Sequence, residues 1–142
     1  MKPEDFFSKE DIELIEDAIK YTAARTSGRI VFHVEKKSGR KALQRAKEIF
    51  VEMGMREPDD KNSVLFLVTT ADKRFTVVGD DGINEKVTQD FWDNVVSAVT
   101  AKFREKEFGI GLVGGINLVA EKLAEFFPVP NAGEDAADGA PL

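Results

Sequence analysis

The chain of 142 residues contains no cysteine, and this absence excludes several classes of site. Disulfide scaffolds, thiolate metal sites and cysteine nucleophiles all require cysteine. His33 is the only histidine, so a zinc site with two histidine ligands is excluded as well. A Ser-His-Asp triad would have to use His33, but no serine stands in a nucleophile-elbow sequence. We therefore interpret His33 as a histidine packed within a sheet.

Long apolar runs and an excess of positive charge are also missing. No segment reaches the roughly 18 apolar residues of a membrane-spanning helix, and the N-terminal residues carry charge where a signal peptide would be apolar. The net charge is −6, and the densest basic spot, residues 36–41, is interpreted as a solvated turn. Nucleic-acid binding needs a clustered basic face. We therefore expect a cytoplasmic, monomeric protein with no nucleic-acid partner.

What the chain does contain is enough apolar residues for one core. They make up 42% of the sequence and include eleven Phe, which suits one domain of ordinary size. A capping box, Ser8 with Asp11, precedes the first helical pattern. Helical spacing of apolar residues recurs over 12–23, 43–53, 91–103 and 112–126, and strand-like runs occupy 29–35, 63–68 and 74–78.

This order of elements predicts a mixed sheet. The first two strands are separated by a helix and should be parallel, whereas the short connection at 69–73 allows only an antiparallel third strand. The continuous apolar run Val64–Val68 is typical of a central strand covered on both faces. We expect an α/β domain over residues 5–128, with about three strands or more and about four helices. Residues 129–142 are small and acidic, and we expect them to be a disordered tail.

One apparent motif has a simple explanation. Residues Gly109–Gly114 match the dinucleotide-binding fingerprint letter for letter. That fingerprint works only directly after a buried strand, and the preceding residues 102–107 have the charged pattern of a helix end. We interpret the glycines as small residues that allow close helix packing. No motif indicates an organic cofactor or a catalytic residue.

Acidic residues gather around the turn Gly79-Asp80-Asp81-Gly82. The predicted topology places this turn beside the starts of the first two strands and beside Asp59 and Asp60. Carboxylate oxygens around glycine suit calcium, a hard cation with 6–8 oxygen ligands, although the spacing is not that of an EF-hand. From spacing alone, a turn with helix N-terminal acids is the preferred interpretation. Asp80, Asp81 and Glu85 are the candidate metal ligands.

Several segments together resemble the TPM domain family in its short cytosolic form. They cover about residues 5–128 and include 6–8, 26–30, 33–35, 52–55, 62–65, 78–87, 91–92 and 108–128. The resemblance implies an α/β/α sandwich, with a surface cleft that binds a divalent metal in some members. It also implies acid phosphatase activity in chloroplast relatives, and photosystem-repair or receptor-accessory roles in others. Asp80 matches the family's Gly-Asp position.

The chain departs from the family pattern at Arg29, where close relatives usually carry an acid. We expect this arginine to neutralise the acidic turn through a charge-assisted hydrogen bond in place of a metal contact. Two functions stay open. The preferred one is an interaction module with a protein partner and a candidate calcium site, and the alternative is a metal-assisted hydrolase of phosphate esters centred on Asp80.

Overall fold

The apolar run that follows Asn62 forms strand β2 (Ser63–Thr69), and every residue of this strand is buried. It lies at the centre of a three-stranded sheet of order β1-β2-β3 in the computed structural model, which describes residues 6–37 and 41–129. Strand β1 (Arg29–Glu35) pairs with β2 in parallel, and β3 (Arg74–Gly79) pairs with it antiparallel. The predicted central strand and both strand directions are confirmed.

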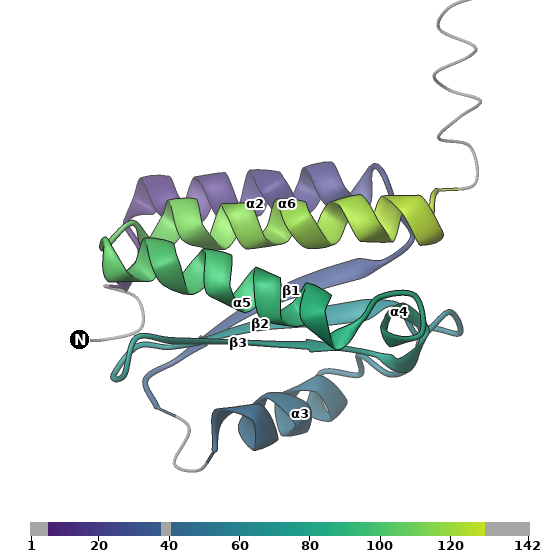
Figure 1. The fold of residues 1–142 in the computed structure, drawn as a ribbon, viewed down its shortest axis with the longest axis horizontal. Helices are drawn as coiled ribbons and strands as arrows, with labels where there is room; N and C mark the ends of the chain where they lie inside the picture. The colour runs from purple at the N-terminus through teal and green to yellow at the C-terminus, as the bar shows by residue number, and fades with distance from the viewer. Residues whose placement is uncertain (1–5, 38–40, 130–142) are drawn as a thin grey trace, which may run out of the picture.

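Helices cover both faces of the sheet, which confirms the predicted sandwich (Figure 1). Helices α2 (Lys9–Ala23), α5 (Gln89–Arg104) and α6 (Phe108–Phe126) form one layer, and α3 (Ala42–Glu52) lies alone on the opposite face. Because strand side chains alternate between faces, Phe66 belongs to the core beneath the three-helix layer, whereas Leu65 and Leu67 pack against α3.

The helix boundaries follow from local chemistry that the sequence displays. Both bonds of the Ser8–Asp11 capping box are present, at 3.0 and 3.2 Å. Gly54, with φ of +68°, occupies the left-handed conformation that commonly ends a helix and follows α3. No helix among the described residues is long and apolar enough to cross a bilayer.

The glycines that resemble a dinucleotide fingerprint lie inside α6, and a helix end precedes them. A side chain at Gly111 or Gly115 would meet Lys102 or Val99 of α5 at 2.8 or 2.6 Å. Small residues at these positions therefore allow α5 and α6 to approach closely, as the sequence predicted.

The acidic turn leads into a short helix that was not predicted as an element, α4 (Asp81–Asn84), a single helical turn directly after β3. Asp80 is its N-cap and Asp81 lies in its first turn, which agrees with the interpretation of these residues as helix N-terminal acids. A second unpredicted feature is a β-bridge between Thr26 and Pro128, which ties the end of α6 to the start of β1. The predicted turn at 38–39 and the acidic tail from residue 130 onward lie outside the described residues.

Candidate functional site

The acidic turn, the start of β2 and the loop at 59–62 meet at one end of the sheet, as the topology predicted. The Asp80 amide donates to the Ser63 carbonyl oxygen at 3.0 Å, which extends the β2–β3 ladder by one pair. The Ile83 amide donates to the carbonyl oxygen of Lys61 at 3.2 Å. Gly82 lies directly on the same loop, because a side chain there would come within 2.0 Å of the Asp60 carbonyl oxygen.

Asp80 is a buried carboxylate whose two oxygens have different surroundings. The residue is 4% exposed, and its Oδ1 accepts a hydrogen bond of 2.8 Å from the Asp81 amide as the N-cap of α4. Its Oδ2 is buried without a hydrogen-bond partner among the described residues. The hydroxyl of Ser63, on the neighbouring strand, is buried and unpartnered in the same way. Buried polar atoms are usually satisfied, so this pair needs an explanation.

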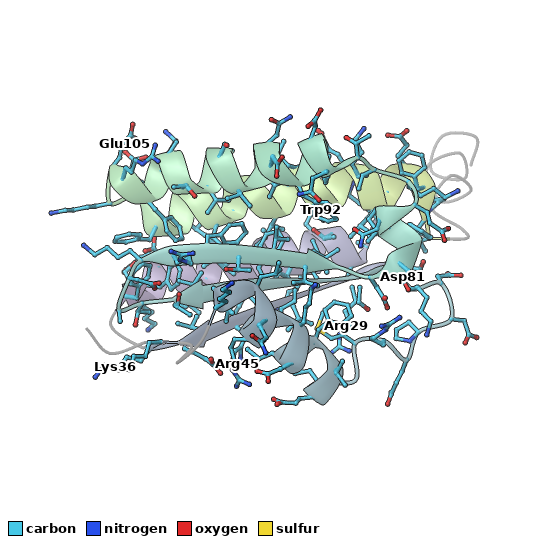
Figure 2. The ribbon with its side chains drawn as sticks, turned by 60° about the horizontal axis from the view of Figure 1, so that its bottom comes forward. Arg29, Lys36, Arg45, Asp81, Trp92 and Glu105 are labelled. Atoms are coloured by element: carbon cyan, nitrogen blue, oxygen red, sulfur yellow. The ribbon has the colours of Figure 1, made fainter. Side chains whose placement is uncertain are left out.

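The arginine that neutralises the turn is Arg56, which corrects the expectation for Arg29. The Arg56 Nε lies 3.6 Å from Oδ1 of Asp80, and its terminal nitrogen donates to Oδ2 of Asp81 at 3.0 Å. Arg29 does lie at this end of the sheet (Figure 2), opposite Ser63, but it is exposed and forms no ion pair with a described residue. The loop after α3, and not the start of β1, therefore supplies the positive charge.

A cleft of 320 Å³ opens beside these acids, between α3 and the end of β3. Asp80 and Asp81 lie on its β3–α4 side, and Lys47 of α3 and Arg56 contribute positive charge. Apolar atoms of Phe50, Val51 and Val78 complete the wall. The cleft therefore carries both signs of charge, and its preference for cations or anions depends on whether Arg56 stays on the carboxylates.

Glu85, the third candidate ligand, is the C-cap of α4, and its side chain is exposed. Its backbone amide donates to the Asp81 carbonyl oxygen at 3.0 Å, a hydrogen bond of the helix that does not involve the carboxylate. No three His, Asp or Glu side chains among residues 6–37 and 41–129 lie close enough together to hold a metal ion. The assignment of Asp80, Asp81 and Glu85 to a metal stays a prediction.

Asn84 holds α4 in place, and the sequence reasoning did not identify it. Its amide nitrogen donates to the Gly79 carbonyl oxygen at 2.8 Å, and its Oδ1 accepts from the Trp92 indole at 2.9 Å. One side chain thereby joins β3, α4 and α5. The spacing offered a weak signal, because an asparagine one helical turn after Asp80 lies on the same side of α4.

His33 belongs to a different polar group, on the α3 face of β1. Its Nε2 lies 3.3 Å from the Glu35 carboxylate, which also accepts two hydrogen bonds from the Arg45 guanidinium at 2.6 and 3.1 Å. The hydrogen bonds from Arg45 lower the pKa of Glu35, although partial burial opposes the shift. The interpretation of His33 as a partnered sheet residue is confirmed, and Arg45 lies on α3 away from the acidic turn (Figure 2).

Comparisons with known proteins agree with this architecture. The solution structure of BA42 protein from the psychrophilic bacterium Bizionia argentinensis is similar, with 38% identity and a TM-score of 0.80 over 87% of this chain and 85% of that one. The N-terminal domain of cg2496 protein from Corynebacterium glutamicum shares the fold alone, at 13% identity and a TM-score of 0.64 over 82% of this chain and 74% of that one.

No curated protein matches the chain. The family model of the TPM domain matches residues 1–122, which is most of this chain. Together with the similarity to BA42 protein, this match shows that the chain belongs to the TPM domain family.

Proposed function

We propose that this TPM domain is a non-catalytic interaction module that binds a divalent cation, with calcium as the first candidate, at the Asp80 turn. The observation that supports it is the buried Oδ2 of Asp80, for which residues 6–37 and 41–129 supply no hydrogen-bond partner. A buried carboxylate oxygen without a hydrogen-bond partner is costly, and a bound cation would compensate this cost. Asp81 supplies a second carboxylate at the rim.

The donor atoms present suit a hard cation. Calcium takes carboxylate, carbonyl and other oxygen ligands in a flexible geometry. The carboxylates of Asp80 and Asp81 and the hydroxyl of Ser63 would bind it, and Glu85 would add negative charge from the end of α4. Within the described part of the chain, the carboxylates of Asp80 and Asp81 are the two that Arg56 brings together, so water would complete the shell and binding would be weaker than in a closed site.

Arg56 is the internal competitor of the cation. Its side chain is 54% exposed, and its ion pair with the exposed Asp81 is of the kind that contributes only about 0–1 kcal/mol. A divalent ion that neutralises both carboxylates would therefore allow the guanidinium to move into solvent. Replacing Arg56 should then favour cation binding, a sign opposite to the one expected for a site that binds an anion.

The test is a calcium and magnesium titration followed by amide NMR shifts in the wild type and in Arg56→Gln. We expect shifts centred on residues 79–85 and binding about two- to fivefold tighter in the variant. Arg104→Gln, an exposed change on α5, is the matched control and should leave the affinity unchanged. Asp80→Asn keeps a good N-cap but removes the charge, and should abolish the shifts. Weaker binding in Arg56→Gln would contradict the proposal.

The alternative function is hydrolysis of a phosphate ester. Its specific support is that Lys47 and Arg56 line the same cleft as Asp80 and could bind phosphoryl oxygens. A divalent ion, when bound, would polarise such an oxygen. Hydrolysis of p-nitrophenyl phosphate tests this alternative, because Arg56→Gln should then reduce turnover and Asp80→Asn should abolish it. Turnover that persists unchanged in both variants would rule out this cleft as the catalytic site.

A further inference from the structure

Strand β3 is an edge of the sheet, and its outer side is lined by two hollows along most of its length. Hollows of 520 Å³ and 420 Å³ lie end to end beside it, and both include Leu43 of α3 and Val77 of β3. Together we call them the edge groove. By comparison, the hollow beside the other edge strand involves only the first residues of β1.

The outer side of β3 carries backbone groups that are not paired with β2. Hydrogen-bonded and non-hydrogen-bonded residue pairs alternate along an antiparallel ladder. The hydrogen bond between Asp80 and Ser63 marks these two residues as a hydrogen-bonded pair, and this fixes which residues of β3 bond to β2. By this alternation, Phe75, Val77 and Gly79 direct their amide and carbonyl groups away from β2. The side-chain amide of Asn84 donates a hydrogen bond to the Gly79 carbonyl oxygen, which confirms that this oxygen points away from β2. Phe75 and Val77 are left to pair outward.

The two walls of the edge groove differ in character. On the α5 side, Trp92 and Val96 offer apolar surface. On the α3 side, Lys47 adds a charge beside Leu43, whose side chain is half exposed. Side chains of an added strand would point alternately to the two walls. The groove therefore suits a strand in which apolar and acidic residues alternate.

The charge of the edge groove also favours an acidic occupant. Lys47, Lys73 and Arg74 line it, and Asp72 is the one acid among its described lining residues. Asp72 is itself paired with Arg74, at 3.3 Å. This local excess of positive charge occurs in a chain whose net charge is −6. Two copies of the edge would bring their cations together, so the same charges oppose pairing of β3 with itself.

We propose that the free edge of β3 is a docking site for an extended acidic peptide of a partner protein, which adds to the sheet as a fourth strand between α3 and α5. Main-chain hydrogen bonds to Phe75 and Val77 provide affinity, and the two walls select the alternating side chains. The inference rests on the proposed role as an interaction module, but it does not depend on the cation site.

The experiment uses a synthetic peptide, acetyl-Glu-Val-Glu-Val-Glu-Val-amide, titrated into the protein and followed by amide NMR. We expect shifts along residues 74–79 and slower hydrogen exchange at Phe75 and Val77. A peptide with Lys in place of Glu, and one whose backbone nitrogens are methylated, should both bind at least about tenfold more weakly, because each loses either the charge match or the strand hydrogen bonds. Equal binding of all three peptides, or no shift at millimolar peptide, would overturn the inference.

Two surface variants test whether peptide binding depends on the edge groove or only on the overall charge of the protein. Lys47→Glu should weaken binding of the acidic peptide about fivefold, and Lys20→Glu on α2 should not. Sedimentation of the free protein addresses a second copy, and a dimer that is lost in Lys47→Glu would overturn the proposed occupant. Repeating the titration in EDTA separates this inference from the cation proposal. Calcium shifts at Asp80 without peptide binding would refute the edge site alone.

Discussion

Replacing Gly82 by alanine is expected to lower the free energy of unfolding by about 2–4 kcal/mol. The reason is contact and not backbone conformation, because Gly54 is the one glycine with positive φ among the described residues. The added methyl would lie 2.0 Å from the Asp60 carbonyl oxygen and 2.6 Å from that of Lys61. Both neighbours are backbone atoms, which cannot rotate away as the end of a side chain can.

The size of the effect follows from what must move. The contact has to lengthen by about 1 Å, which separates α4 from the loop at 59–62. That movement stretches the hydrogen bond between the Ile83 amide and Lys61, which is 3.2 Å long, and disturbs the fully buried Ile83 side chain. Overpacking costs about 1–3 kcal/mol, and a lost hydrogen bond adds about 0.5–1.5 kcal/mol.

The matched control is Gly114→Ala in α6. A methyl group there meets nothing within 4 Å, so the helix should gain about 0.5–1 kcal/mol. Urea denaturation measures both, and with a slope of about 2 kcal/mol/M the midpoint of Gly82→Ala should fall by about 1–2 M. Wild-type stability in Gly82→Ala would refute the claim that α4 rests directly on the loop.

Further predictions concern other polar contacts. Arg45 lowers the pKa of Glu35 in the folded protein below its unfolded value of 4.5. The ionised carboxylate therefore stabilises the fold fully above pH 4.5, and this contribution is lost as the pH falls through the lower folded pKa. We expect the difference in unfolding free energy between wild type and Glu35→Gln to shrink below pH 4.5. Asn84→Ala removes two hydrogen bonds, and we expect a loss of about 1–3 kcal/mol with a change in Trp92 fluorescence. Thr26→Val should cost about 1–3 kcal/mol in urea denaturation, because the buried hydroxyl joins the ends of α6 and β1.

Two of these predictions have close controls in the chain. Gln89→Ala removes only an exposed side-chain hydrogen bond to Asp93 and should change stability by less than about 0.5 kcal/mol. Thr22→Val removes a bond within α2, to the Ala18 carbonyl oxygen, and should cost less than Thr26→Val. If Gln89→Ala lowered the stability as much as Asn84→Ala, the long-range role assigned to Asn84 would be wrong. The same holds for Thr26 if Thr22→Val cost as much as Thr26→Val.

The fold was predictable because its main signals are local. The run Val64–Val68 is apolar at every position, and the connection of a few residues before Arg74 allows only an antiparallel return. Helix α4 has no such signal. It is one turn long and contains Gly82, a poor helix former, so its stability comes from the burial of Ile83 and from the contact with the Asp60 loop.

The candidate site was predictable in position and not in its partners. Strand directions place Arg29 and the acidic turn at one end of the sheet, and this much the structure shares with the prediction. The choice of Arg56 over Arg29 depends on the path of the loop after Gly54, where Met55 is fully buried and the next side chain is turned toward Asp80. Spacing along the sequence contains no information about such a path.

The cation site and the edge groove are separate proposals that share one wall. Lys47 lines both the 320 Å³ cleft beside Asp80 and the adjoining part of the edge groove. A divalent ion on Asp80 and Asp81 would release Arg56 and raise the positive charge near this wall, which favours an acidic strand. Because coupling between two binding sites is reciprocal, the strand would then favour the ion to the same degree. Calcium and an acidic partner are therefore expected to bind cooperatively, because the bound ion and the released Arg56 both add positive charge near this wall.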